Sequence, residues 1–313
     1  MIQKRTIGIV GTGHVGVAAA YAVFLRGLCS EIILIDKNHE RAEGEAMDLM
    51  HGQAFGEPVT ARAGAYEDLD RAQLVVISAG VAQKEGETRL DLLNRNADVF
   101  REIIGQLDRH APQAVLVIAT NPVDVLTYVS QKLSRRPGSQ VVGTGTMLDT
   151  ARFRALLGRH YKVDPRSVHA YIVGEHGDSE VPLWNSARIG GVSLLDHTIS
   201  GRAFDKEAME GLFERVRNAA YDIISRKGYT NTAIGSAIAR LVEAVLADQG
   251  SVLPVGRLLE GHYDIDDVCL SIPTIVGSSG VREALLPRLS DEERAGLQHS
   301  ARVLQKSLRE LAL

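Results

Sequence analysis

Cysteine is scarce in this 313-residue chain, which contains only Cys29 and Cys269. The two residues stand far apart and form no Cys-x-x-Cys pair, so the sequence indicates neither a disulfide framework nor a cysteine zinc site. Long hydrophobic runs are missing too, because no apolar stretch reaches the roughly 18 residues that a membrane helix needs. We therefore expect a soluble, cytoplasmic protein in a reducing compartment, without a membrane partner.

The chain also lacks a large excess of positive or negative residues. The chain has 35 Lys and Arg residues against 39 Asp and Glu residues, for a net charge of −4, and no segment gathers the basic ones into a stripe. This distribution excludes a nucleic-acid partner. Lys4 and Arg5 precede an apolar stretch over 15–25 that resembles a secretion signal. The glycines at 11, 13 and 16 and the lack of a cleavage-like boundary favour a folded strand, turn and helix instead.

The first half of the chain alternates short apolar runs with helical patterns. Four runs are apolar at nearly every position, as in parallel strands buried on both faces: Thr6–Val10, Glu31–Asp36, Gln73–Ala79 and Ala114–Ala119. Between the last two runs, Asp98–His110 carries its apolar residues on one helical face. This alternation predicts an α/β fold, a Rossmann-type doubly wound parallel sheet over residues 1–145.

The second half has a different pattern, which predicts an α+β substrate domain over residues 146–313. Apolar runs predict a strand and a hairpin closed by a longer loop, at Val168–Val173, Ser251–Val255 and Asp267–Ile272. Helical spacing of apolar residues predicts three helices, from Met209 to Ile224, from Ile234 to Val245, and from a capping box at Ser290 onward.

A glycine-rich turn directly follows the first predicted strand. In the hexapeptide GTGHVG, Gly11 permits the tight turn, Gly13 lets the backbone approach a pyrophosphate, and Gly16 lets helix and strand pack closely. Asp36 ends the next strand, where a carboxylate accepts hydrogen bonds from an adenosine ribose and repels a 2′-phosphate. We therefore expect NAD as the cofactor rather than NADP. A solvated loop acid is the alternative interpretation of Asp36.

Four polar stretches follow predicted strands or begin a helix: residues 80–89, 120–122, 148–152 and 174–178. Ligands of open α/β sheets bind at the carboxyl ends of the strands, so we expect these stretches to meet at one site. Gly80 and Gly86 would let the first stretch move as a lid.

The residues in these stretches suit the oxidation of a 2-hydroxy acid. His176 is the best proton acceptor, because imidazole titrates nearest neutral pH. A buried Asp149 beside it would fix its tautomer and raise its pKa. Arg152 offers a planar fork for a substrate carboxylate, and Arg89, on the closing loop, would polarise the carbonyl. The alternative is structural: Asp149 and Arg152 pair on a helix surface, and Arg89 is a solvated loop charge.

With these residues identified, the chain resembles the L-lactate/malate dehydrogenase family along its whole length. The matching stretches are GTGHVG, AEGEAMDL, GETRLDLLNRN, ATNPVDVLTY, GTMLDTARFR and GEHGDS. The resemblance implies reversible hydride transfer between NADH and pyruvate, giving L-lactate and NAD⁺, and it implies no metal.

The same resemblance assigns roles to individual residues. It implies His176 as the proton donor and acceptor, Asp149 as its partner, and Arg152 and Arg89 as the carboxylate anchor and the polarising arginine. Further substrate contacts are implied for Asn121, Asp124 and Thr230, with a cis bond before Pro122. The positions at which the family touches the dinucleotide are Gly11, Gly13, Val15, Gly16, Asp36, Arg41, Tyr66, Gly80, Val81, Ala119, Asn121 and Thr144.

Gln83 bears on the choice between lactate and malate. By the resemblance, this position faces the substituent on the reacting carbon of the substrate. Lactate dehydrogenases of the family have glutamine there, as this chain does, whereas malate dehydrogenases have arginine. Oxaloacetate beside Gln83 would bury an unpaired charge, at a cost of several kcal/mol, whereas the methyl group of pyruvate would not. Lys84 next to it would favour malate if it turned inward.

A regulatory site is implied by the same resemblance. Bacterial lactate dehydrogenases of the family that resemble this chain are tetramers, often activated by fructose 1,6-bisphosphate between subunits. The corresponding positions are Arg154 and His169, both basic, as a bisphosphate requires. The alternative is an exposed ion-pairing arginine and a strand histidine.

Two other functions remain as alternatives. A malate dehydrogenase is the nearest one, and comparing pyruvate with oxaloacetate would separate the two. A non-catalytic NAD-binding protein is the other. It would keep the glycine turn and Asp36 but would have no use for Arg89, Asp149, Arg152 and His176 together.

Overall fold

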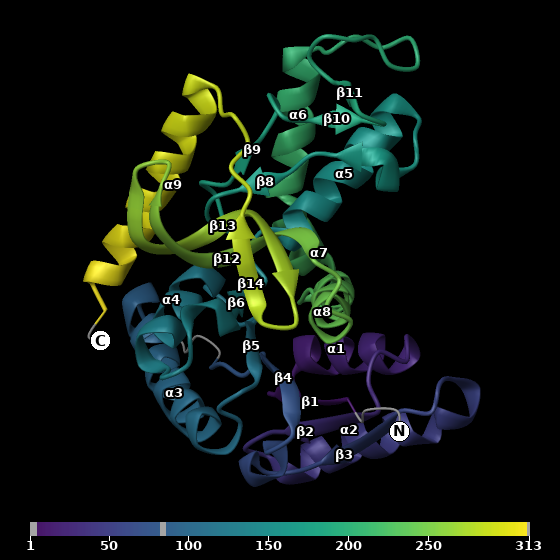
Figure 1. The fold of residues 1–313 in the computed structure, drawn as a ribbon, viewed down its shortest axis with the longest axis vertical. Coiled ribbons are helices and arrows are strands. Elements are labelled where there is room, and N and C mark those ends of the chain that lie inside the picture. The colour runs from purple at the N-terminus through teal and green to yellow at the C-terminus, as the bar shows by residue number, and fades with distance from the viewer. Residues whose placement is uncertain (1–4, 82–85, 312–313) are drawn as a thin grey trace.

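The computed structural model describes residues 5–81 and 86–311. Over these residues, its main feature is a nine-stranded sheet in the order β14-β13-β12-β6-β5-β4-β1-β2-β3 (Figure 1). The six strands of the first half run parallel: β1 (Thr6–Val10), β2 (Glu31–Ile35), β3 (Thr60–Ala63), β4 (Ala72–Ile77), β5 (Val115–Ile118) and β6 (Val141–Gly143). Their order, 3-2-1-4-5-6, confirms the predicted Rossmann-type sheet.

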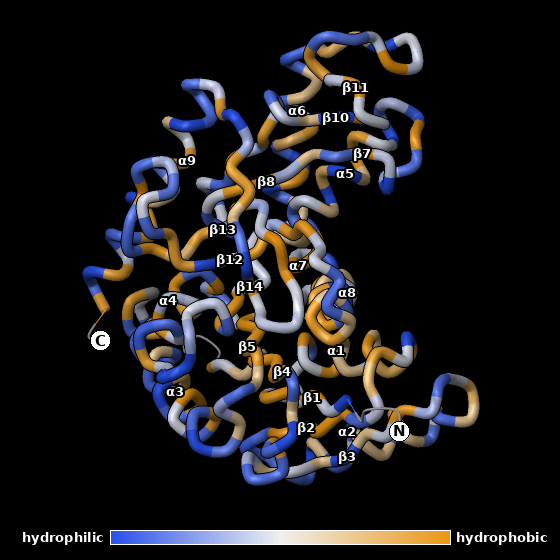
Figure 2. The backbone as a smooth tube through the Cα atoms, in the orientation of Figure 1, coloured by the Kyte–Doolittle hydropathy of each residue, from blue (hydrophilic) through white to orange (hydrophobic). Residues whose placement is uncertain are grey.

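Helices cover both faces of this sheet. One hydrophobic core includes residues of α1 (His14–Leu25), α2 (His39–His51) and α8 (Thr232–Leu246), and the other includes residues of α3 (Arg89–His110), α4 (Val123–Leu133) and α9 (Asp291–Arg309). Residues of one strand alternate between the two cores: Leu74 and Val76 belong to the first, and Val75 and Ile77 to the second. Hydrophobic residues accordingly line the strands in the interior (Figure 2).

The second half continues the same sheet rather than building a separate one. β12 (Ser251–His262), β13 (Ile265–Gly277) and β14 (Gly280–Ala284) are antiparallel, and β12 joins the first half where Gly256 pairs with Gly143. Helix α8 packs closely along α1, where a Cβ atom on Gly235 would lie 2.7 Å from the carbonyl of Ala18. The second half is thereby fixed against the glycine turn.

The rest of the second half contains a third core, which includes Phe153 and Leu157. Residues of this core come from α5 (Met147–Tyr161), α6 (Lys206–Arg217), β7 (Val168–His169), β8 (Ile172–Val173) and β10 (Arg188–Ile189). The other elements there are α7 (Ala219–Lys227), β9 (Val181–Pro182) and β11 (Val192–Ser193). Short 3-10 helices complete the described chain: η1 (Gln53–Phe55), η2 (Tyr66–Leu69), η3 (Gly138–Gln140) and η4 (Pro165–Ser167).

Three predicted elements differ in the structure. The strand expected at 168–173 is two strands, because β7 pairs with β10 whereas β8 pairs with β9. The helix expected from 209 to 224 is interrupted at Asn218, a residue type whose side chain competes for backbone groups and favours helix ends. The hairpin has no long loop, because Tyr263 and Asp264, with φ values of 56° and 62°, close a two-residue turn between long strands.

Candidate active site

The glycine turn has the geometry that a dinucleotide needs. Gly11 has a φ of 98°, which L side chains rarely adopt, and a Cβ atom on Gly16 would lie 1.9 Å from the carbonyl oxygen of Gly11. A Cβ atom on Gly13, by contrast, would meet nothing within 4 Å. The outer two glycines are therefore required by the fold, and the middle one borders open space beside the N-terminus of α1, where a phosphate group fits.

Asp36 lies where the ribose of the dinucleotide is expected. Its Oδ2 atom accepts hydrogen bonds from the backbone N of Thr12 at 2.7 Å and from Thr12 Oγ1 at 3.0 Å, and Oδ1 accepts from the backbone N of Asn38 at 3.0 Å. Partial burial acts to raise the pKa of Asp36, but these hydrogen bonds outweigh it and hold the pKa below its usual value. The carboxylate is thus an anion that would accept from a ribose hydroxyl and repel an added phosphate.

The other predicted cofactor residues gather at the same edge of the sheet. Arg41, in the first turn of α2, and Tyr66, in η2, both interact electrostatically with Asp36. Burial raises the pKa of Tyr66 to about 12, so its hydroxyl stays protonated. The remaining ones lie on α1 or just after β4, β5 and β6: Val15, Gly80, Val81, Ala119, Asn121 and Thr144. The expected cofactor contacts thus follow the carboxyl ends of the parallel strands, where ligands of open α/β sheets bind.

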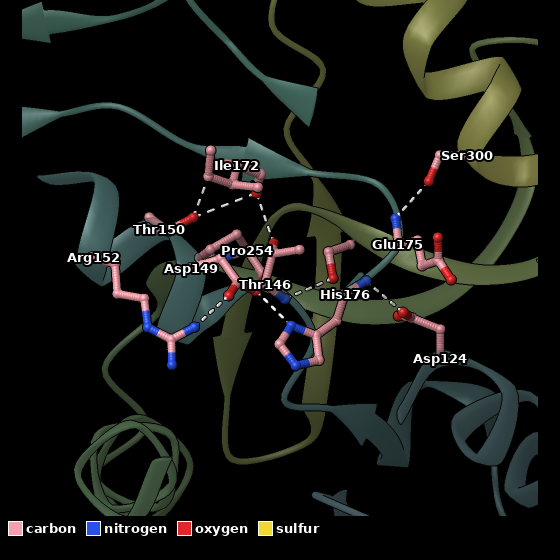
Figure 3. Close-up of polar contacts among 11 residues, drawn as sticks. Asp124, Thr146, Asp149, Thr150, Arg152, Ile172, Glu175, His176, Pro254 and Ser300 are labelled. Atoms are coloured by element: carbon pink, nitrogen blue, oxygen red, sulfur yellow. Dashed lines mark hydrogen bonds and ion pairs between the residues drawn. The ribbon is translucent and has the colours of Figure 1, made fainter. Parts of the chain in front are cut away.

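Asp149 lies between His176 and Arg152, and its two oxygens contact one residue each (Figure 3). Nδ1 of His176 is 2.5 Å from Oδ2, and Nη1 of Arg152 is 3.0 Å from Oδ1. Asp149 and Arg152 lie in the first turns of α5, and His176 follows β8. The Asp149–Arg152 pair that was the structural alternative does exist, but it is not on the surface, since only 5% of the Asp149 side chain is exposed.

Buried charges set the protonation of this group. Burial disfavours the charged form of His176, but the negative charge and hydrogen bond of Asp149 outweigh it and raise the pKa of His176 to about 9. For Asp149, burial is likewise the largest influence, yet His176 and Arg152 hold its pKa below the usual value. The pair is therefore an imidazolium next to a carboxylate at neutral pH.

Helix α5 is attached to strand β8 by hydroxyl groups that sequence reasoning missed. Thr146 Oγ1 donates to the carbonyl of Ile172 at 2.7 Å, and Thr150 Oγ1 accepts from the backbone N of Ile172 at 2.9 Å. Ser271 Oγ in turn accepts from the backbone N of Thr146 at 3.0 Å. These bonds hold the segment that carries Asp149 against the strand that leads to His176. The sequence alone gives no sign of these bonds, because Thr146 and Thr150 belong to no recognisable motif for them.

Two further carboxyl groups lie close to His176. The backbone N of His176 donates to Oδ2 of Asp124 at 2.7 Å, and burial raises the pKa of Asp124 to about 7. Glu180, which sequence reasoning missed, is 6% exposed, and burial followed by the charge of Asp149 raises its pKa to about 8. Among the described residues, Oδ1 of Asp124 and Oε1 of Glu180 are buried without a hydrogen-bond partner. Acidic side chains thus surround the imidazole.

A cavity of about 1070 Å³ opens onto these side chains. Its lining includes Asn121, Asp124, Asp149, Arg152, His176 and Glu180. The His176 side chain is 26% exposed and that of Arg152 14%, so both are accessible from the cavity. The bond between Asn121 and Pro122 is cis, as expected. Thr230 is half-buried just before α8 and is not part of this lining.

Two predicted residues are not described in full. Gln83, with its neighbour Lys84, lies outside the described residues. Arg89 was expected on a loop, but it is the first residue of α3, because Thr88 and Asp91 form a capping box that starts the helix there. The side chain of Arg89 lies outside the described part.

The two residues expected at an effector site lie on α5 and β7 and are linked through Ala170. Nε of Arg154 donates to the carbonyl of Ala170 at 2.9 Å, and its guanidinium lies 4.8 Å from the centroid of the Tyr171 ring. His169, next to Ala170, is exposed on β7. Over the described residues, no group of three His, Cys, Asp or Glu side chains could hold a metal ion, and no helix is long and apolar enough to cross a membrane.

A dinucleotide turn, a buried imidazole–carboxylate pair and an arginine at one cavity define a nicotinamide-dependent dehydrogenase. Residues 5–143 match the sequence profile of the lactate/malate dehydrogenase NAD binding domain, and residues 146–312 match that of the lactate/malate dehydrogenase alpha/beta C-terminal domain. The chain therefore belongs to the lactate/malate dehydrogenase family, and its cofactor is NAD.

Individual relatives are similar over nearly the whole chain. L-lactate dehydrogenase of Salinibacter ruber is 61% identical over 314 residues, which cover 100% of this chain and 99% of the relative. L-lactate dehydrogenase of Thermus aquaticus is 49% identical, over 96% of this chain and 97% of the relative. The crystal structure of minor L-lactate dehydrogenase from Enterococcus mundtii superimposes with a TM-score of 0.96 at 42% identity, covering 99% of each chain.

Proposed function

We propose that the chain is an L-lactate dehydrogenase, which reversibly converts pyruvate and NADH into L-lactate and NAD⁺. The observation that carries the proposal is the position of Asp149 between His176 and Arg152 at one cavity. The names of the relatives from Salinibacter ruber and Thermus aquaticus support the same activity.

In this proposal, His176 is the proton donor for pyruvate reduction. Its Nδ1 atom faces Asp149, so Nε2 remains for the substrate oxygen. Bound NADH supplies the hydride to the carbonyl carbon. As charge develops on the carbonyl oxygen, Nε2 of His176 gives up its proton and a hydroxyl group forms. Asp149 stabilises the imidazolium before transfer and holds the neutral ring in the correct tautomer afterwards. Lactate oxidation follows the same path in reverse.

The remaining side chains bind and polarise the substrate in this proposal. Arg152 uses Nη1 for Asp149, which leaves its other N–H groups for the substrate carboxylate. Arg89 polarises the carbonyl, and Asn121, Asp124 and Thr230 complete the substrate site. Asp124 acts through the backbone N of His176, to which it is hydrogen-bonded.

In this proposal, the NAD site lies in residues 1–145 and the substrate site lies mainly in residues 146–313. The proposed cofactor contacts are Gly11, Gly13, Val15, Gly16, Asp36, Arg41, Tyr66, Gly80, Val81, Ala119, Asn121 and Thr144. The open space at Gly13 and the anionic Asp36 support an NAD site there. We propose a cytoplasmic homotetramer that acts in fermentative glycolysis.

Initial rates with NADH and either pyruvate or oxaloacetate test the activity. We expect a higher kcat/KM for pyruvate, and Gln83→Arg is expected to shift the preference toward oxaloacetate, because the arginine would pair the second carboxylate. A wild-type preference for oxaloacetate would make the chain a malate dehydrogenase instead. NADH binding without turnover of either substrate would support a non-catalytic protein.

Regulation by fructose 1,6-bisphosphate at Arg154 and His169 is part of the same proposal. The exposed His169, adjacent in the chain to Ala170 whose carbonyl accepts from Arg154, supports a site for a bisphosphate. We expect the effector to lower the apparent KM for pyruvate, because two basic side chains favour a bisphosphate. Superimposable pyruvate curves with and without the effector would refute this regulation.

A further inference from the structure

We propose that a second cavity, between α5, α6 and the turn at 199–202, binds a small phosphate-bearing anion. The cavity has a volume of about 280 Å³ and shares no lining residue with the catalytic cavity. Four basic residues line it: Arg159, His160, Arg202 and Arg215. Neither Arg154 nor His169 belongs to it, so it is separate from the effector site proposed above.

No carboxylate side chain of a described residue lines this cavity. Among the described residues, no side chain forms an ion pair or a hydrogen bond with the side chains of Arg159, His160, Arg202 or Arg215. Two of the three acids on α6 pair elsewhere, Glu214 with Arg217 and Glu210 with Lys206, and the third, Glu207, is exposed and does not line the cavity. The cavity therefore concentrates positive charge in a chain whose net charge is −4.

Arg202 lies close enough to His160 to affect its protonation. Burial is the largest influence on the pKa of His160 and lowers it, and the positive charge of Arg202 lowers it further. Asp205, whose side chain accepts from the backbone N of Ala208 at the start of α6, offsets part of this effect.

Helix dipoles account for only part of this arrangement. Arg159, His160 and Arg215 lie in the last turns of α5 and α6, where basic side chains are common. Arg202 does not lie on a helix. The turn that carries it is closed by reciprocal hydrogen bonds of 2.9 Å between the backbones of Ile199 and Arg202, which direct a third segment of the chain to the same cavity.

The floor of the cavity is fixed by the core of the second half. Leu212 is buried in that core, and Leu156 packs against it. The basic groups thus border a small cavity with an apolar floor. Guanidinium forks match the oxygens of a phosphate group in geometry and charge. The volume accommodates a phosphate group with a few further atoms, so inorganic phosphate and a small phosphate monoester share the required chemistry.

Thermal unfolding of the full chain with increasing inorganic phosphate tests the site, with chloride keeping the ionic strength constant. We expect a saturable rise in Tm. The double variant Arg202→Gln/Arg215→Gln should weaken the apparent affinity by about tenfold or more, because two charge-assisted contacts are lost. Without phosphate its Tm should not fall, since no ion pair is removed.

Two control variants make the result specific. Arg302→Gln removes one positive charge from an exposed position on α9 and should keep the phosphate response of the wild type. Arg154→Gln removes any phosphate contact at the proposed effector site, so the response that remains in it should come from the second cavity. The same titration with glycerol 3-phosphate distinguishes the ligand: tighter binding than phosphate indicates a monoester site, and equal binding a site for phosphate itself. A response that does not saturate, or that the double variant retains, overturns the proposal.

Discussion

Nδ1 of His176 lies 2.5 Å from Oδ2 of Asp149, a carboxylate whose other oxygen contacts Arg152 at 3.0 Å. One buried acid thereby orients both the proton donor and the arginine proposed to hold the substrate carboxylate. The pKa of His176 is raised and that of Asp149 is lowered by the same pairing. A change at Asp149 must therefore affect proton transfer and substrate binding together.

Replacement of this acid by its amide is the first prediction. Asp149→Asn keeps the shape of the side chain but removes the charge that stabilises the imidazolium. We expect kcat for pyruvate reduction to fall by about 10²- to 10⁴-fold, the usual contribution of general acid–base catalysis. KM for pyruvate should rise, because Arg152 no longer faces a charged partner. NADH binding, followed by fluorescence, should stay unchanged as a control. A wild-type kcat in this variant would contradict the assigned role of the pair.

The second prediction concerns pH. Pyruvate reduction needs His176 protonated, so kcat/KM should be level below its pKa and fall as pH rises through about 9. Lactate oxidation needs the neutral ring, so its kcat/KM should rise with pH and level off above the same value. In Asp149→Asn, burial acts on the pKa of His176 without the strongest group that opposes it, and both curves should move to lower pH. Profiles that stay in place in the variant would exclude Asp149 as the cause of the raised pKa.

His176, Asp149 and Arg152 could be predicted from the sequence, because each stands in a polar stretch placed after a buried strand or at a helix start. Strand β3 could not, since only one of its four residues is buried and it leaves no apolar run. The two-residue turn at Tyr263 and Asp264 was missed for a related reason: both residues have positive φ values, but the pair lacks the glycine that signals such a turn. Glu180 was missed because its burial depends on distant parts of the chain.

Glu180 is the subject of the third prediction. At about pH 6 its carboxyl group is neutral, because its pKa is raised to about 8, so Glu180→Gln should leave kcat/KM for pyruvate unchanged there. Above that pKa the wild-type side chain is charged and helps to keep His176 protonated. The fall in pyruvate reduction should therefore begin at lower pH in the variant. A large loss of activity at about pH 6, with an unshifted profile, would show that Glu180 acts otherwise.

The fourth prediction separates the two roles of glycine in the turn. Gly16→Ala places a Cβ atom 1.9 Å from the carbonyl of Gly11, so backbone must move. We expect its free energy of unfolding to fall by about 1–3 kcal/mol or more, as for other overpacked sites. At Gly13 a Cβ atom meets nothing within 4 Å and the φ of −73° suits any residue. Gly13→Ala should therefore unfold at nearly the wild-type Tm.

The same two variants differ in what they do to NADH. A methyl group on residue 13 would occupy the space through which the pyrophosphate approaches the backbone, so Gly13→Ala should raise the Kd for NADH by about tenfold or more although its fold is intact. Gly16→Ala should lose stability as well as NADH affinity, because the backbone that it displaces at Gly11 belongs to the proposed cofactor site. Wild-type NADH affinity in Gly13→Ala would mean that the open space beside α1 is not where the phosphates bind, and the cofactor site would have to be assigned elsewhere.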